Sequence, residues 1–216
     1  MRAVWILDLD NTLYPADSGL FAEVDRRIRR FMEERLNIPP GRIPELRACY
    51  RERYGVTLGG LMAHYGVEPG EYLEYVHDVP LDRYLGPDPD LDRVLDRLPG
   101  PKVVFTNGSS AHAWRVLRLL GVAGRFQGVY DIAFMDYVPK PRPHGYRKLL
   151  KALGVPPAAC WMVDDLPENL ETARALGLRT VLVGPRPVPP HFHVSSFKEL
   201  PARLDGACPA VPAPGC

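Results

Sequence analysis

Runs of apolar residues predict the strands of this chain. The run from Val4 to Leu7 is unbroken and contains aromatic and β-branched side chains, which is typical of a strand buried on both faces. Similar short runs recur in the second half of the chain. The predicted strands cover residues 4–7, 102–106, 132–134, 160–163 and 180–183, and we expect 180–183 to be the last strand.

Apolar positions spaced three and four residues apart predict helices between these strands. The expected helices span residues 20–37, 46–54, 58–65, 71–76, 90–98, 110–120, 146–153 and 168–176. Strands that alternate with helices imply right-handed crossovers and a parallel sheet. We therefore expect an α/β fold with a mostly parallel sheet.

The segment between the first two strands is far longer than a crossover needs. It shows no period-two alternation, so we expect an inserted all-helical domain at residues 15–85. Turn-forming residues mark its two connections, near 15–19 and 85–89. The core domain would combine residues 1–14 with 86–205, and the Pro- and Ala-rich residues 206–216 would form a disordered tail.

The charge and cysteine content narrow the classes of function. Lys and Arg total 27 against 26 Asp and Glu, a net charge of +1, which argues against binding to nucleic acid or to a membrane surface. The four cysteines form no CxxC pair, so we expect neither a metal-thiolate site nor a disulfide framework. This cysteine usage is typical of a protein in a reducing compartment. Acids at positions 8 and 10 interrupt the apolar run that a signal peptide would need. We expect a soluble, cytoplasmic protein.

Polar clusters follow three of the predicted strands. Asp8 and Asp10 follow the first strand, Thr106-Asn107-Gly108 ends the second, and Asp164-Asp165 follows a later one. The C-terminal ends of parallel strands meet at one edge, where open α/β sheets bind ligands. Carboxylates crowded there require protonation or a neutralising cation. Oxygen-only ligands favour Mg²⁺.

Each cluster also has a simpler explanation when it is considered alone. Two acids at a strand end are most often a turn feature, Asp164-Asp165 could cap a helix, and Lys140 would by default be a surface residue in a loop. The functional interpretation is favoured by order and placement, because the lysine lies between the second and third clusters.

In this order the clusters resemble the four motifs of the haloacid dehalogenase superfamily. Asp8-Leu9-Asp10-Asn11-Thr12 resembles motif I, Thr106-Asn107-Gly108 motif II, Lys140 motif III and Asp164-Asp165 motif IV. The helical insertion after motif I is similar to the C1 cap of that superfamily. The resemblance covers residues 4–183 and implies a Rossmann-like three-layer sandwich that carries a helical cap.

A narrower resemblance points to the pyrimidine 5′-nucleotidase branch. It rests on residues 13–15, 54–61 and 77–81, on 105–108 with 112–113, and on 163–165 with 168–169. The sequence departs from this branch at Val56, where a small or hydroxyl residue is common, and the departure concerns substrate fit more than chemistry.

The resemblance implies catalytic roles. Asp8 would be the nucleophile that forms an aspartyl-phosphate, and Asp10 would protonate the leaving group and later activate water. Thr106 would bind phosphoryl oxygens, and Lys140 would neutralise the charge of the phosphate and the nucleophile. A carboxylate at position 10 favours phosphoryl transfer over dehalogenation, because departing halide needs no proton.

The resemblance also implies an Mg²⁺ site. The ligands would be the Asp8 carboxylate, the Asp10 backbone carbonyl and the Asp164-Asp165 pair, with Asp165 as the expected direct ligand. Asn169, on the helix that follows, would orient these ligands.

Candidate substrate-binding residues are Asn11, Asn107, Gly108, Tyr54 and His77. The aromatic residues Tyr50, Tyr54 and His64 could stack on a base, although positions at helical spacing more often form the core or surface of a cap. We expect His112 on a helix surface, and we expect His191-Phe192-His193 to be a loop without a metal-binding role.

Together these observations predict a Mg²⁺-dependent phosphomonoesterase. Its partner would be a small phosphorylated metabolite, with UMP or CMP preferred, and the enzyme would be a monomer or a homodimer. The alternatives are a sugar-phosphate or phosphoglycolate phosphatase, a phosphomutase, or a non-catalytic binding protein on the same fold. A non-catalytic protein would be expected to have lost a motif residue, and each motif is intact in this sequence.

Overall fold

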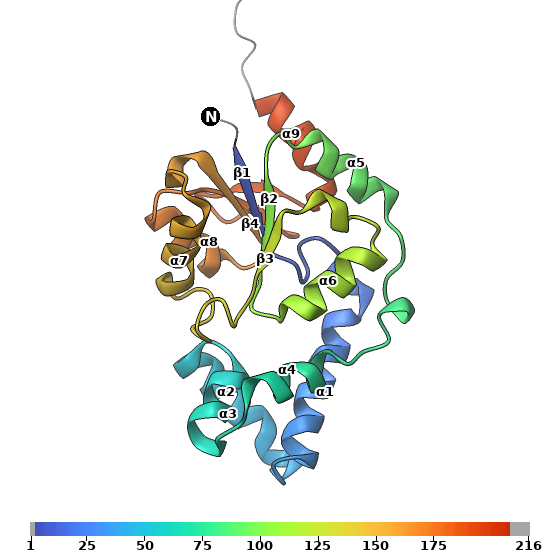
Figure 1. Cartoon of the computed structure of the whole chain (residues 1–216), viewed down its shortest axis with the longest axis vertical. Coiled ribbons are helices and arrows are strands. Elements are labelled where there is room, and N and C mark those ends of the chain that lie inside the picture. Colours follow the sequence, from blue (N-terminus) through green and yellow to red (C-terminus); the bar gives the residue numbers. More distant parts are fainter. Residues whose placement is uncertain (1–2, 208–216) are drawn as a thin grey trace, which may run out of the picture.

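A computed structural model describes residues 3–207, in which a six-stranded sheet forms the centre of the molecule (Figure 1). The strand order is β3-β2-β1-β4-β5-β6, and every neighbouring pair is parallel. The strands are β1 Val4–Leu7, β2 Lys102–Phe105, β3 Gly128–Tyr130, β4 Cys160–Asp164, β5 Arg179–Val183 and β6 Phe192–Val194. The α/β, Rossmann-like fold with a parallel sheet is confirmed.

Helices α1–α8 agree in position with the predicted ones, and most of them begin slightly earlier, whereas α9 was not predicted. They are α1 Leu20–Glu34, α2 Ile43–Tyr54, α3 Thr57–Tyr65, α4 Pro69–His77, α5 Pro89–Arg97, α6 Ser110–Leu119, α7 Pro143–Leu153, α8 Pro167–Ala175 and α9 Leu200–Ala207. Proline stands at the first position of α4, α5, α7 and α8, where its fixed φ suits the helix and its missing N–H needs no partner.

Helices cover both faces of the sheet. Successive side chains of a strand point to opposite faces, so neighbouring residues pack into different clusters. Trp5 and Leu7 pack into the cluster that contains the buried residues of α5, α6 and α9. Val4 and Ile6 face the opposite cluster, with α7 and α8. This two-sided burial explains the continuous apolar runs, and Figure 1 shows the two helical layers on either side of the sheet.

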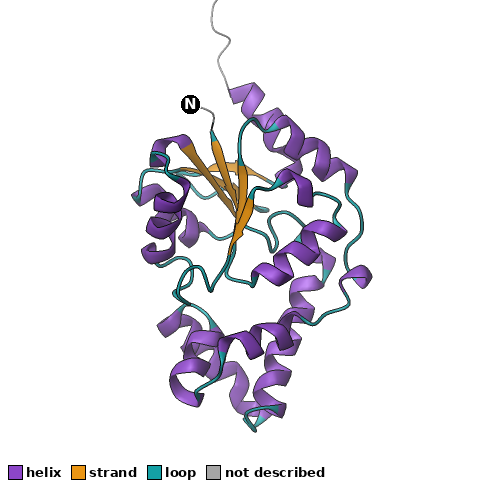
Figure 2. Cartoon of the chain, viewed as in Figure 1, coloured by secondary structure: helices purple, strands orange, loops and turns teal. Residues whose placement is uncertain are grey.

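Helices α1–α4 form a separate group at the C-terminal edge of the sheet, which we call the helical lobe (residues 20–77; Figure 2). Within the lobe, α1 packs on α4 and α2 packs on α3. Its interior includes Phe31 of α1 and Tyr72 of α4, whose rings meet edge to face at 5.1 Å. Most buried residues of the lobe are continuous with the hydrophobic cluster on one face of the sheet, so the lobe packs against the core beside the edge where the polar clusters lie.

Three local predictions are wrong. Residues 132–134 form a turn, because the Asp131 carboxylate accepts hydrogen bonds from the backbone N–H groups of Phe134 and Ser110, both at 2.8 Å. The third strand is instead β3. Residues 192–194, expected in a loop, form β6 beside β5, so 180–183 is not the last strand.

The end of the chain also differs from the prediction. Residues 200–207 form α9, so the first two residues of the expected tail are helical. The remainder of that tail, residues 208–216, lies outside the described residues. Within residues 3–207, no helix combines the length and the apolar character needed to cross a bilayer.

Candidate active site

The polar clusters meet at one edge of the sheet because their strands are neighbours. Strands β2, β1 and β4 lie side by side, and they deliver Thr106, Asp8 and Asp164 to their C-terminal ends. The backbone N–H of Asp8 donates to the Val163 carbonyl at 2.9 Å, which continues the β1–β4 pairing into the site. The topology therefore brings together residues that are between 58 and 156 positions apart in the sequence.

Lys140 lies at the centre of this cluster. Its Nζ donates to Asp8 Oδ1 and to Asp164 Oδ2, both at 2.7 Å, and its side chain is 1% exposed. Burial opposes the charge of Lys140, but the two carboxylates outweigh it and raise the pKa of the ammonium above its usual value. Lys140 is a buried cation and not a surface residue.

The acidic groups exceed this single positive charge. Asp8, Asp164 and Asp165 have ligand oxygens that all lie within 4.8 Å of one another. Burial raises the pKa of Asp8 well above its usual value, and the nearby carboxylates add to this against the effect of Lys140. Burial and Asp164 likewise raise the pKa of Asp165 to about 6. Such a cluster could bind a metal ion.

The two adjacent aspartates have different surroundings. Asp164 is fully buried, and its Oδ1 accepts hydrogen bonds from the Asn169 side chain at 2.8 Å and from the Leu166 backbone N–H at 3.0 Å. Because Lys140 Nζ donates to Oδ2, both oxygens of the Asp164 carboxylate already accept hydrogen bonds. Asp165 is only partly buried and lines the adjoining cavity.

Asp10 lies beside two groups that favour its ionised form. The Tyr14 hydroxyl donates to Asp10 Oδ1, and the same oxygen lies 3.7 Å from Nε2 of His112. Burial would raise the pKa of Asp10, but His112 and Tyr14 outweigh it and hold the pKa below its usual value.

His112 is not on a helix surface, contrary to the prediction. Its side chain is 1% exposed, and its ring stacks on His77 at a centroid distance of 4.3 Å. The sequence signal for this position is weak: His112 follows motif II on the first turn of α6, and its stacking partner is 35 positions away. Only the folded chain shows that it borders Asp10.

The residues of motif II hold one another and Lys140. Thr106 Oγ1 accepts the Gly108 backbone N–H at 2.9 Å. The Asn107 side chain pairs with both backbone groups of Lys140: it donates to the carbonyl at 3.2 Å and accepts from the N–H at 2.9 Å. Asn107, predicted to bind substrate, therefore uses its side chain to position Lys140.

A cavity of about 340 Å³ adjoins these groups and extends to the helical lobe. Of the predicted substrate-binding residues, Asn11, His77, Asn107 and Gly108 line it. Tyr54 is not part of its lining, and its hydroxyl lies 2.9 Å from His64 Nε2. The lining also includes residues that the sequence analysis did not single out, among them Arg47, Arg51 and Tyr72.

The two histidines of residues 191–193 have separate partners. His191 Nδ1 lies 2.8 Å from the Thr180 hydroxyl, and His193 Nε2 lies 2.7 Å from the Gly184 carbonyl oxygen. Both contacts are local to the β5–β6 edge of the sheet, away from the acidic cluster.

Two curated proteins are similar to this chain over most or about half of its length. Phosphate metabolism protein 8 of Saccharomyces cerevisiae is 27% identical over 196 residues, which are 84% of this chain and 61% of that protein. Phosphatase MT3486 of Mycobacterium tuberculosis is 37% identical over 124 residues, which are 56% of this chain and 57% of that protein. The chain thus spans only about three-fifths of the length of these relatives.

Solved structures share the fold at low sequence identity. The L-2-haloacid dehalogenase from Xanthobacter autotrophicus matches with a TM-score of 0.62 and 18% identity, over 96% of this chain and 100% of that one. A HAD phosphatase from Thermococcus onnurineus matches with a TM-score of 0.65 and 20% identity, over 95% and 99% of the two chains. The model of the haloacid dehalogenase-like hydrolase family matches residues 3–177. The chain therefore belongs to the haloacid dehalogenase-like hydrolases.

Proposed function

We propose that this protein is a Mg²⁺-dependent phosphomonoesterase that works through an aspartyl-phosphate intermediate. The observation that carries the proposal is the position of Asp8, which pairs with buried Lys140 and lines the cavity together with Asp10 and Asp165. One of the similar proteins bears the name phosphatase, which supports the same activity for this chain.

The donor set fits Mg²⁺. It consists of oxygens alone, it carries more negative charge than Lys140 can balance, and Asp165 has a carboxylate that is not tied to Asn169 or Lys140. The Asp8 carboxylate, the Asp10 backbone carbonyl and Asp165 would hold the ion, while Asp164 would orient Lys140. A bound Mg²⁺ would neutralise charge on the phosphoryl oxygens.

In the first step, Asp8 would attack phosphorus in line, and the bond from phosphorus to the leaving oxygen would break. Lys140 and the Thr106 hydroxyl would stabilise the charge of the transferring group. Asp10 would give its proton to the leaving oxygen. A phosphate anion beside Asp10 raises its pKa by like-charge repulsion, so the proton would be taken up together with the substrate.

In the second step, water would attack phosphorus of the aspartyl-phosphate and release Asp8. Asp10, now ionised, would accept the proton from that water. The Tyr14 hydroxyl and the His112 ring hold the Asp10 carboxylate in a form ready for this role.

We propose further that residues 15–85 are a C1 cap and that the preferred substrates are nucleoside 5′-monophosphates such as UMP and CMP. The supporting observations are the cavity shared by the lobe and the core and the resemblance of cap and hinge to the pyrimidine nucleotidase branch. A sugar-phosphate phosphatase, a phosphoglycolate phosphatase and a phosphomutase agree equally well with the catalytic residues. The cytoplasmic location and the monomeric or homodimeric state remain predictions.

A phosphate-release assay across a panel of phosphomonoesters, with Mg²⁺ or with a chelator, tests both the phosphatase activity and the preference for nucleotides. We expect release that needs Mg²⁺ and is fastest for UMP or CMP. Faster turnover of a sugar phosphate or phosphoglycolate would reject the nucleotide preference and keep the phosphatase. Absence of release from every ester, by a folded protein in Mg²⁺, would contradict the enzyme itself.

A further inference from the structure

The wall of the cavity contributed by the helical lobe contains a buried arginine. Arg47 of α2 is 5% exposed and lines the same cavity as Asp8 and Lys140 of the core. Around it the wall is largely apolar, with Val24, Ile28, Leu58, Leu73 and Val76. A guanidinium in such a wall needs acceptors for its N–H groups, because burying a charge without partners is costly.

The chain itself supplies only part of these acceptors. Arg47 Nη2 donates to Asp25 Oδ1 at 2.5 Å, and Nε donates weakly to the Thr57 hydroxyl at 3.5 Å. A guanidinium has five N–H donors. The other three, which include both on Nη1, have no acceptor among residues 3–207. Asp25 is the partly buried counter-ion of Arg47, and its other oxygen pairs with Arg29, whose side chain is exposed to solvent. A neutral acceptor would therefore complete the site without adding a second negative charge to the wall.

Two hydroxyl groups accompany Arg47 in the lining. Thr57 is 5% exposed and Tyr72 is 4% exposed, and both line the cavity. Among the described residues no hydrogen bond is formed by the Tyr72 hydroxyl, and its ring packs edge to face on Phe31 at 5.1 Å. The lobe therefore offers a buried polar cluster, Arg47 with Thr57 and Tyr72, in a mostly apolar wall whose lining also includes the exposed Arg51.

We propose that Arg47, with the hydroxyls of Thr57 and Tyr72, binds a neutral carbonyl oxygen on the part of the substrate remote from the phosphate. The apolar wall would contact the faces of a flat ring, and the Arg47 N–H groups would donate to the ring carbonyl. Arg47 is then the residue that determines specificity for carbonyl-bearing heterocycles. This inference rests on the proposed function, and it names the chemistry by which the cap selects a substrate.

The test compares the binding of two probes that cannot be hydrolysed. One is the UMP analogue in which a methylene group replaces the bridging 5′ oxygen, and the other is the same compound with a phenyl ring in place of uracil. Titration calorimetry with wild-type protein and Mg²⁺ should give a Kd about 10- to 100-fold lower for the uracil probe, because the phenyl ring leaves the Arg47 donors unpaired.

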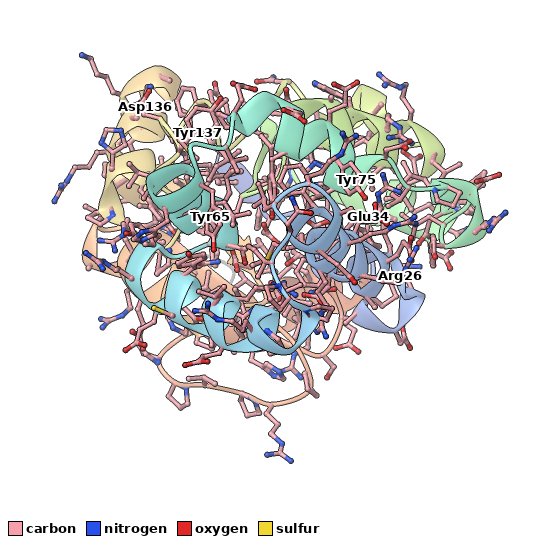
Figure 3. All side chains as sticks on the ribbon, turned by 90° about the horizontal axis from the view of Figure 1, so that it is seen from below. Arg26, Glu34, Tyr65, Tyr75, Asp136 and Tyr137 are labelled. Atoms are coloured by element: carbon pink, nitrogen blue, oxygen red, sulfur yellow. The ribbon has the colours of Figure 1, made fainter. Side chains whose placement is uncertain are left out.

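Variants then assign the difference to the polar cluster. Arg47→Met and Tyr72→Phe should weaken binding of the uracil probe, by about 10-fold or more for Arg47→Met, and should leave the Kd of the phenyl probe unchanged. Tyr75→Phe is the matched control: Tyr75 is also on α4, but its hydroxyl donates to Glu34 at 3.0 Å and it is not part of the cavity lining. Figure 3 labels Tyr75 and Glu34 beside each other on the lobe.

Equal Kd values for the two probes on wild-type protein would overturn the proposal, and this comparison needs no variant that might fail to fold. An equal loss for both probes in Tyr72→Phe would also overturn it, as would tighter binding of a carboxyphenyl probe than of the uracil probe. Binding is measured without turnover, so a protein that releases no phosphate refutes the proposed function while the probe comparison still decides this inference.

Discussion

The Lys140 ammonium lies 2.7 Å from both Asp8 and Asp164 in a position almost closed to water. Removing one partner of a buried ion pair leaves an uncompensated charge, which costs about 3–5 kcal/mol. We expect Lys140→Met to lower the free energy of unfolding by about 3 kcal/mol and turnover by about 10²- to 10³-fold. Urea unfolding and steady-state kinetics measure the two effects.

Lys148→Met is the control for this substitution. Lys148 pairs with Asp136 at 2.8 Å at the surface, and such pairs contribute about 1 kcal/mol or less. If the two variants lost the same stability and Lys140→Met kept its activity, the central role of Lys140 would be wrong.

Asp10 offers its side chain for proton transfer and only its backbone carbonyl for the metal. We therefore expect Asp10→Asn to slow turnover by about 10²- to 10⁴-fold and to leave Mg²⁺ affinity nearly unchanged. Calorimetric titration of the variant with Mg²⁺ measures the metal affinity, and steady-state kinetics measures the turnover. A large loss of metal binding would mean that the Asp10 carboxylate is itself a ligand.

His77 predicts a dependence of stability on pH. Burial and then the nearby His112 lower the pKa of His77 to about 3, whereas in the unfolded chain it is near 6.5. Between these values the unfolded state binds a proton and the native state does not. The stability contributed by neutral His77 is therefore present above pH 6.5 and is lost as the pH falls toward 3, by at most about 1.4 kcal/mol per pH unit.

We expect His77→Gln to flatten this part of the profile of unfolding free energy against pH. Denaturant titrations at several pH values between 6.5 and 4 give the slope for each protein. An unchanged slope in the variant would show that His77 is protonated in the native state or that other groups govern the acid response.

At the scale of elements, most of the fold could be predicted because burial on both faces leaves a clear pattern. The apolar runs of β1, β2, β4 and β5 and the helical spacing of α1–α8 are visible in the sequence. The short strand β3 was missed because Ile132 to Phe134 is the more apolar run, yet Asp131 closes a turn there. Strand β6 is short and directly follows a proline-rich segment, which hides its pairing with β5.

The residues of the candidate site that lie at strand ends can be predicted from the sequence. Asp8, Thr106 and Asp164 follow apolar runs, and parallel topology alone brings them together. The neighbours of those residues were not predictable. His112 beside Asp10, Arg47 in the cavity wall and the bonds of Asn107 to the Lys140 backbone depend on packing between distant elements.

The corner between α2 and α3 connects the lobe to the loop that carries Lys140. Gly55 has φ +86°, and a Cβ added there would lie 2.7 Å from Pro139 Cγ. Nearby, Arg142 Nη2 donates to the Arg53 carbonyl at 2.7 Å. A side chain at position 55 would therefore strain the backbone and push against the residue that precedes Lys140.

We expect Gly55→Ala to reduce both activity and stability. Gly66→Ala is the matched control, because Gly66 also has a positive φ, +64°, but open space where a Cβ would lie. The control should lose about 1–2 kcal/mol from backbone strain alone, and Gly55→Ala about 1–3 kcal/mol more from overpacking. Unfolding and kcat/KM are measured for both; equal values would show that the corner does not support the site.

At the scale of the whole molecule, the core and the lobe have separate tasks in this account. The core presents Asp8, Asp10, Lys140 and the Asp164-Asp165 pair at one edge of a rigid parallel sheet. The lobe closes the cavity above them with a mostly apolar wall and a buried polar cluster. Chemistry would thus be set by the core and substrate choice by the lobe.

The most direct test of the central claim is to trap the phosphorylated nucleophile. Wild-type protein with Mg²⁺ and an aryl phosphate, quenched in acid during turnover, should carry a phosphoryl group on the peptide that contains Asp8. The Asp8→Asn protein should carry none and should hydrolyse the ester only at the background rate. A phosphoryl group on another residue, or hydrolysis by Asp8→Asn at the wild-type rate, would contradict the assignment of Asp8 as nucleophile.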